Sequence, residues 1–259
     1  MKRLGAVLLA LALVFCVAPV TAQSADQLVA VIVFTIDDGA TSLYQYIFPA
    51  LNLYKFPATA YIITNVVGDS EHVTWPQIQT LNWTYGWEIG NHTMSHPHLT
   101  GLTYDQQVAE IYGAHEALRE HGILGVQSFA PPFGEFDADT LNALLLTGHT
   151  SNRLAWDDTD QLNWPATFNE WNINVISYRN PLTFAKNIKP LITETVAGKK
   201  TLVIALHDSN PDGKGEYNLP LADLKAMLAY VNTLVGKKQI VVKTMSSATV
   251  DLMRYRSLP

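Results

Sequence analysis

One short stretch constrains the fold more than any other: residues 31–39 read Val-Ile-Val-Phe-Thr-Ile-Asp-Asp-Gly. An apolar run with several β-branched residues is typical of a strand that is buried on both faces. This run stops at two adjacent carboxylates, Asp37 and Asp38, which repel each other and lose hydration unless a cation or a shared proton relieves them. Because Asp-Gly is also a common turn dipeptide, the stretch alone leaves an acidic turn and a cation-binding strand end both open.

The first 22 residues have the pattern of a secretory signal peptide. A lysine and an arginine precede an apolar run over residues 4–18, and the small residues that end at Ala22 suit cleavage after that position. The run is short for a membrane anchor, and polar residues follow it closely. We therefore expect a protein that is secreted or held in the periplasm or cell envelope, without stable insertion in a membrane.

The predicted mature chain, residues 23–259, is acidic and contains no cysteine. Cys16 is the one cysteine of the sequence and lies in the signal segment, which excludes a disulfide or a thiolate site in the mature chain. Loss of Lys2 and Arg3 removes two positive charges and takes the formal charge from -6 to -8. An acidic chain without a basic run is poorly suited to nucleic acid. No linker or repeat divides residues 23–259, so we expect one domain and a monomer.

Patterns typical of strands and helices alternate along the mature chain. Strands are predicted at residues 31–36, 58–63, 87–90, 126–130, 151–156, 174–178, 202–206 and 240–242. Helices are predicted at residues 43–53, 75–83, 104–121, 138–146, 184–197 and 221–235, with a short helix after the last strand. This alternation favours a parallel sheet with right-handed crossovers. The predicted fold is α/β, an irregular TIM-like (β/α) barrel of seven or eight parallel strands, with a doubly wound open sheet as the alternative.

Polar residues cluster directly after four of the predicted strands. The clusters occupy residues 37–38, 91–97, 131–134 and 207–208. In a parallel barrel the loops that follow the strands meet at the C-terminal rim, where such proteins build their active sites. The four clusters are therefore expected to face one another at this rim.

His92 and His96 are four residues apart, which places both imidazoles on one face if the turn between them is helical. Two imidazole nitrogens and one carboxylate suit a divalent metal and leave positions open for water. Zinc proteases use the same histidine spacing, but Thr93 stands where those enzymes carry their glutamate, which excludes that class. A histidine pair alone need not bind a metal, but beside Asp37 and Asp38 it predicts a metal site.

His207 follows the apolar run at residues 202–206. A histidine that leaves a buried strand at the rim suits a general acid or base, although hydrogen bonding at the barrel mouth would explain it as well. The remaining histidines are expected in surface or capping positions: His72, His98, His115, His121 and His149.

Four segments in this order resemble the motifs of the polysaccharide deacetylases, the NodB homology group known as carbohydrate esterase family 4. They are Thr-Ile-Asp-Asp-Gly at 35–39, His-Thr-Met-Ser-His-Pro at 92–97, Pro-Pro-Phe-Gly at 131–134 and Ile-Ala-Leu-His-Asp at 204–208. The resemblance covers nearly the whole mature chain.

The resemblance implies a role for each polar residue. Asp37 would be the general base, while Asp38, His92 and His96 would bind a divalent metal, with Zn²⁺ the expected ion. His207 would protonate the leaving nitrogen or oxygen.

The same resemblance implies the surroundings of the acetyl group. The backbone N–H of Phe133 would stabilise the oxyanion together with the metal. Ile204 and Leu206 are the expected apolar lining around the acetyl methyl.

The sequence departs from the family pattern at two places. The third motif usually begins with an arginine that orients the base, and Ala130 stands there instead. We expect Arg153, from the next strand, to reach Asp37 in its place, preferably through two hydrogen bonds, although a surface salt bridge is the alternative. The fourth motif is matched only loosely, and Asp158 is its favoured acidic residue.

The predicted function is a secreted, metal-dependent deacetylase that hydrolyses acetamido groups on N-acetylated carbohydrate. Chitin, peptidoglycan and poly-N-acetylglucosamine are substrates of this type, and the partner would be an acetylated oligo- or polysaccharide. Two alternatives stay open, namely an O-acetyl esterase acting on xylan and a non-catalytic carbohydrate-binding relative.

Overall fold

The computed structural model describes residues 28–155 and 161–256. Two predictions fall outside these ranges: the signal peptide over residues 1–22 and the role given to Asp158. The prediction of a single domain over residues 23–259 extends beyond them at both ends.

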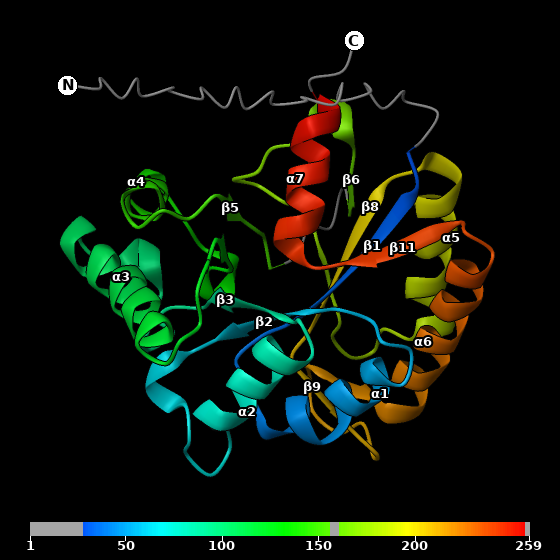
Figure 1. The fold of residues 1–259 in the computed structure, drawn as a ribbon, viewed down its shortest axis with the longest axis horizontal. Helices are drawn as coiled ribbons and strands as arrows, with labels where there is room; N and C mark the ends of the chain where they lie inside the picture. The colour runs from blue at the N-terminus through cyan, green and yellow to red at the C-terminus, as the bar shows by residue number, and fades with distance from the viewer. Residues whose placement is uncertain (1–27, 156–160, 257–259) are drawn as a thin grey trace, which may run out of the picture.

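A curved, mostly parallel sheet forms the centre of the molecule (Figure 1). Its strands run in the order β5-β4-β3-β2-β1-β8, with β11 also paired to β1 and β7 also paired to β8. The strands are β1 (Ala30–Ile36), β2 (Thr59–Ile62), β3 (Glu88–Asn91), β4 (Ser128–Phe129), β5 (Ser151–Asn152), β7 (Ile176–Ser177), β8 (Thr201–Leu206) and β11 (Ile240–Lys243). Within this sheet, eight strands of the described ranges therefore pair in parallel, as the alternating pattern predicted.

The sheet curls into an irregular barrel. A parallel bridge between Arg153 and Ile173 joins the β5 edge to the chain that leads into β7, and β7 pairs with β8. The predicted α/β barrel is thus confirmed. One further strand was not predicted: β6 (Leu162–Asn163) runs antiparallel to β8. Three strands are also shorter than predicted: β4, β5 and β7 keep two residues each.

Helices cover the outside of the sheet, with α3 and α4 on one side of the molecule and α5 and α6 on the other (Figure 1). The helices are α1 (Phe48–Asn52), α2 (Trp75–Gln79), α3 (Tyr104–Glu120), α4 (Ala138–Leu146), α5 (Lys189–Gly198), α6 (Leu221–Gly236) and α7 (Met245–Arg256). Three of the predicted helices are part α-helix and part π-helical turn. The π-helical turns are Leu43–Ile47 before α1, Thr80–Thr84 after α2 and Phe184–Ile188 before α5. Capping boxes begin α3 and α4, which explains why their starts could be predicted.

Strand β1 is buried along its whole length, as its apolar run predicted. One face carries Ile32 and Phe34 into the core that includes α1, α5 and α6. The other face carries Val31 and Val33 toward Met245 and further residues of α7. Helix α7 therefore closes the side of the barrel that the outer helices do not cover.

Beyond β8 the chain forms a feature that the sequence patterns did not predict. Strands β9 (Asp208–Asn210) and β10 (Asn218–Pro220) pair with each other in a separate two-stranded sheet. This sheet brings the loop between them to the rim. Within the described ranges no helix is long and apolar enough to cross a membrane.

Candidate metal and catalytic site

Asp37 and Asp38 sit where β1 ends. The Asp37 N–H donates to the Leu206 carbonyl at 2.8 Å, which extends the pairing with β8 by one residue. The chain then turns sharply, because Asp38 (φ 67°) and Gly39 (φ 78°) both adopt left-handed conformations. Because of this turn, the two carboxylates point in different directions, and each contacts different side chains.

His92 and His96 follow β3 in a turn that is not helical, so the helical condition attached to their spacing is not met. Thr93 (φ 68°) and His96 (φ 59°) adopt left-handed conformations, which no α-helical turn contains. The two imidazoles still meet, with ring centroids 4.9 Å apart. The Thr93 hydroxyl oxygen accepts the His96 N–H at 3.0 Å and fixes this turn.

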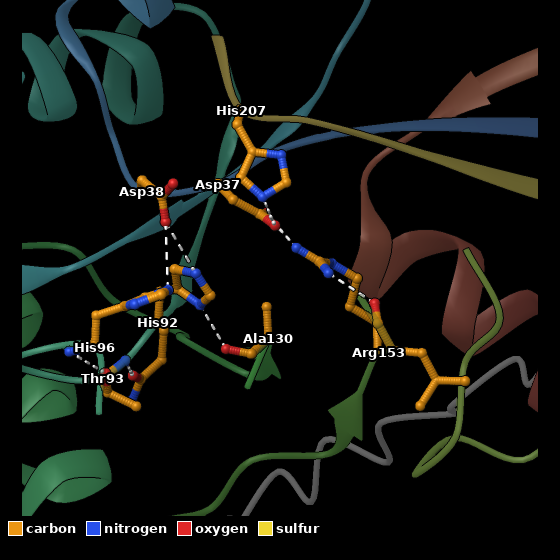
Figure 2. Close-up of polar contacts among 10 residues, drawn as sticks. Asp37, Asp38, His92, Thr93, His96, Ala130, Arg153 and His207 are labelled. Atoms are coloured by element: carbon orange, nitrogen blue, oxygen red, sulfur yellow. Dashed lines mark hydrogen bonds and ion pairs between the residues drawn. The ribbon is translucent and has the colours of Figure 1, made fainter. Parts of the chain in front are cut away.

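One carboxylate oxygen and two imidazole nitrogens converge in the part of the chain that the structure describes. Oδ1 of Asp38 lies 3.3 Å from His92 Nε2 and 3.6 Å from His96 Nε2 (Figure 2). Nδ1 of His92 donates to the Ala130 carbonyl at 2.6 Å, which leaves Nε2 free to bind a metal. Oδ1 of Asp38 is buried and makes no hydrogen bond of acceptable geometry.

The pKa values of two of the three groups also suit a cation. Burial opposes ionisation of Asp38, but His92 and the neighbouring imidazoles lower the pKa of this carboxyl well below its usual range. Burial and the proximity of His92 lower the pKa of His96 to about 4, so its imidazole is neutral at pH 7. Burial opposes the charged form of His92, but the carboxylates of Asp38 and Asp37 raise its pKa overall, so a bound metal would displace a proton there. The three residues therefore fit a divalent metal, with one anionic oxygen and two nitrogens on one side and a pocket on the other.

Asp37 lies between Arg153 and His207, away from the three converging ligand atoms (Figure 2). Nη2 of Arg153 donates to Asp37 Oδ1, and His207 Nε2 lies 3.6 Å from Asp37 Oδ2. Arg153 and Asp37 are almost fully buried, with exposed fractions of 1% and 3%. Burial raises the pKa of Asp37, but the Arg153 guanidinium, with smaller effects of His207 and His92, holds the net pKa below the usual value.

The contact between Arg153 and Asp37 is present as predicted, but its geometry differs from the expected double hydrogen bond. Nη1 of Arg153 donates to the Leu154 carbonyl at 2.7 Å, which turns the guanidinium away from a two-bond arrangement. Its Nε makes no hydrogen bond within the described ranges. The Tyr61 ring supports the guanidinium from one side, with its centroid 4.9 Å from Arg153 Cζ.

A pocket of about 150 Å³ opens above these groups. Its polar floor consists of Asp37, Asp38, His92, His96 and His207, and its apolar wall of Pro131, Phe133, Ala155 and Tyr217. The prediction that Ile204 and Leu206 line it is wrong. Both side chains belong to the core beneath the outer helices, because alternate residues of β8 face opposite sides of the sheet.

Phe133 lies at the pocket wall in a left-handed conformation (φ 58°). Its ring meets His96 edge-on at 4.7 Å and stacks on His98 at 4.0 Å between centroids. His98 in turn contacts Glu135 through Nδ1 at 2.9 Å. His98 is thus a rim residue that supports the pocket wall, not merely a surface histidine.

Sequence reasoning missed two lining residues and misplaced one histidine. Tyr217 comes from the loop between β9 and β10, and its ring centroid lies 4.9 Å from that of His207. Ala155 touches the pocket from the end of the β5 segment. His149 was expected at the surface or in a cap, but it is buried with 3% of its surface exposed.

The parallel barrel carries at its rim three groups that fit a divalent metal, next to a buried carboxylate and a histidine, an arrangement that suits the activation of water. Residues 25–151 match the model of the polysaccharide deacetylase family. Together with the fold and the four motifs, this match shows that the chain belongs to the polysaccharide deacetylase family, as its sequence motifs predicted.

Two curated relatives match about half of the chain. A chitin deacetylase of Cryptococcus neoformans var. grubii is 31% identical over 136 residues, which cover 51% of this chain and 28% of that protein. A bifunctional xylanase/xylan deacetylase of Cellvibrio japonicus is 28% identical over 131 residues, which cover 50% of this chain and 18% of that protein. The chain thus spans less than half the length of these two relatives.

The fold is also that of a solved structure. The family 4 carbohydrate esterase of Streptomyces lividans, determined in complex with acetate, superposes with a TM-score of 0.56 at 19% sequence identity. The superposition covers 85% of this chain and 95% of that chain. The likeness therefore extends over most of the barrel.

Proposed function

We propose that this protein is a metal-dependent deacetylase that removes acetyl groups from N-acetylated carbohydrate of the chitin, peptidoglycan or poly-N-acetylglucosamine type. The observation that carries the proposal is the convergence of Asp38, His92 and His96 beside an Asp37 carboxylate that Arg153 keeps ionised. Membership of the polysaccharide deacetylase family and the chitin deacetylase relative support it.

Asp38, His92 and His96 would hold the divalent ion, for which we propose Zn²⁺. When bound, such an ion lowers the pKa of water and polarises a carbonyl oxygen. The remaining work falls to groups of this chain. Asp37, held by Arg153, would take the proton from the attacking water.

The bond changes follow from the positions of the remaining groups. A C–O bond forms between the water oxygen and the acetyl carbon, and the bond from that carbon to the sugar nitrogen breaks. His207 would give the proton that the leaving nitrogen needs, so that the products are acetate and a free amine. Phe133 lines the pocket, and we propose that its N–H donates to the developing oxyanion.

The same groups can hydrolyse an acetate ester, for which the xylan deacetylase relative is a specific argument. An O-acetyl esterase is therefore the second candidate. The geometry speaks against the non-catalytic alternative, because Asp38, His92 and His96 converge and Asp37 lies between Arg153 and His207 although position 130 is alanine.

We also propose that the protein acts outside the cytoplasm. This proposal rests on the signal-peptide pattern of residues 1–22. Insoluble or polymeric acetylated saccharides are substrates that an exported enzyme can reach.

The direct experiment measures acetate released from chitin oligomers, peptidoglycan, poly-N-acetylglucosamine and acetylated xylan, with Asp37→Asn as the matched inactive control. The proposal predicts Asp37-dependent release from at least one N-acetylated substrate, faster than from xylan. Release from xylan alone would establish the esterase instead. Binding without acetate release from any substrate would contradict catalysis.

A further inference from the structure

A buried histidine that the proposed chemistry does not use lies behind the metal-ligand turn. His149 follows α4, and its two ring nitrogens both have partners. Nδ1 lies 2.8 Å from the Thr147 hydroxyl oxygen, and Nε2 lies 3.2 Å from the Asn91 side-chain nitrogen. Asn91 is the last residue of β3 and directly precedes the metal ligand His92.

The hydrogen bonds assign one tautomer to this histidine. The Thr147 hydroxyl donates its one hydrogen to the Ala143 carbonyl at 2.9 Å. In its contact with His149 it is therefore the acceptor, and His149 Nδ1 carries the proton. Nε2 then carries the lone pair that accepts the Asn91 amide N–H. Burial lowers the pKa of His149 to about 3, with His115 adding to the effect, so the ring is neutral at pH 7 and keeps this arrangement.

The chain of hydrogen bonds continues to the ligand turn. The second amide hydrogen of Asn91 goes to the Ile111 carbonyl at 2.8 Å, which fixes the orientation of the amide. Its Oδ1 then accepts the Thr93 N–H at 2.8 Å, and the Thr93 hydroxyl accepts the His96 N–H. Thr93 and His96 are the two residues of this turn in the left-handed conformation, which costs free energy unless the surroundings hold it.

We propose that His149 is a positioning residue for the metal site, acting through Asn91 and Thr93 on the ligands His92 and His96. A ring at this place that cannot accept the Asn91 proton would leave a buried amide hydrogen without a partner and let the amide turn. The Thr93 N–H would then lose its acceptor, and the two imidazoles would lose the alignment that a metal requires. The inference rests on the proposed function only in requiring that the site binds a metal.

The matched variants are His149→Phe, which keeps the ring but removes both nitrogens, and His149→Gln, whose side-chain oxygen can accept from Asn91. His115→Phe is the control, because the His115 ring lies 5.5 Å from that of His149 but makes no bond to Asn91. Zn²⁺ affinity is measured by calorimetry, and Co²⁺ absorption reports the ligand geometry. Thermal unfolding of the metal-free proteins monitors the fold.

For His149→Phe we expect metal affinity to fall on the order of 10-fold, the lower end of the range seen for groups behind metal ligands. The Co²⁺ spectrum should change, and lost hydrolysis should return at excess metal. His149→Gln should restore most of the affinity, and His115→Phe should match the wild type. A folded His149→Phe protein with wild-type affinity and spectrum would overturn the inference, as would an equal loss in His115→Phe.

If His149→Phe does not fold, Thr147→Val decides the matter. Valine keeps the volume of threonine but removes the oxygen that accepts from His149 Nδ1. Weaker metal binding by this variant supports the inference, and unchanged binding overturns it. Wild-type protein that binds no metal would instead contradict the proposed function itself, so the two failures are distinguishable.

Discussion

Arg153 and Asp37 form a buried ion pair although 116 positions separate them in the sequence. The arginine follows β5 and the aspartate follows β1, so the pair joins two strands that lie apart in the order of the sheet. The family's motif arginine would stand at position 130, where this chain has alanine. The same carboxylate is thus held by a guanidinium from a different strand.

Arg153→Ala should shift the acidic limb of the pH–rate profile to higher pH. The base must be deprotonated to act, and Arg153 offsets the effect of burial on the pKa of Asp37. Without the arginine the pKa of Asp37 rises. As the pH is lowered, the carboxylate is then protonated earlier, and activity falls at a higher pH than in the wild type. Removal of one partner of a buried pair should also cost about 3–5 kcal/mol of folding stability.

Two further arginine variants sharpen this test. Arg153→Lys should retain a positive charge but lose turnover, because one ammonium nitrogen cannot take the positions of both Nη2, which donates to Asp37, and Nη1, which donates to the Leu154 carbonyl. Arg119→Ala removes the exposed pair with Glu116 and should change neither turnover nor the pH profile. An unchanged acidic limb in Arg153→Ala would refute the assigned role.

Asp37→Asn should bind metal like the wild type but lose most turnover. The amide has nearly the same shape and can still accept from Arg153, but it cannot take a proton from water. Loss of a general base typically costs about 10²–10⁴-fold in rate. Calorimetry measures the metal affinity, and kcat measures the turnover. If the variant lost metal binding but kept a normal rate per bound metal, Asp37 would be the metal ligand and Asp38 the base.

His92→Ala and His96→Ala should each abolish tight metal binding while the barrel stays folded. The ligand atoms lie at the rim, and the apolar core beneath them does not depend on either imidazole. Elemental analysis of the purified proteins measures the metal, and circular dichroism the fold. His72→Ala is the matched control, because His72 bonds to Asp69 outside the ligand set and its loss should leave the metal content unchanged.

Tyr217→Ala should relax selectivity for the acyl group. The Tyr217 ring forms part of the pocket wall beside His207, where it would meet the acyl chain of a larger substrate. Rejection of one extra methylene by an apolar wall is worth about 10–200-fold in kcat/KM. The ratio of kcat/KM for N-propionyl and N-acetyl substrates should therefore rise in Tyr217→Ala and not in Tyr217→Phe. Equal ratios in all three proteins would exclude Tyr217 from the wall in solution.

The sequence predicted the parts of the fold that depend on local patterns. Strand β1 was recognisable because an apolar run that long must be buried on both faces, and α3 because its apolar residues recur at helical spacing. The prediction could not tell which face of β8 meets the helices, since Leu202–Leu206 is apolar at every position. The side chains of Ile204 and Leu206 were therefore assigned to the wrong face.

In the candidate site, too, the sequence predicted some features and missed those that depend on contacts between distant segments. The residues of the ligand set and the reach of Arg153 to Asp37 were expected from motifs and strand order, and the structure brings these groups together. The left-handed turn at Thr93 and His96 was not, because its conformation depends on the Asn91 side chain, whose amide is held by His149, which is distant in the sequence. Tyr217 was missed since only the pairing of β9 with β10 brings it to the pocket.

The central claim is that Asp38, His92 and His96 bind one divalent ion that hydrolysis requires. The most direct test adds Zn²⁺ stepwise to metal-stripped wild-type protein and measures acetate released from an N-acetylglucosamine oligomer. We predict no release without metal, then a rise that levels off at one ion per chain and is absent in His96→Ala. Full acetate release from protein shown by elemental analysis to hold no metal would contradict the claim.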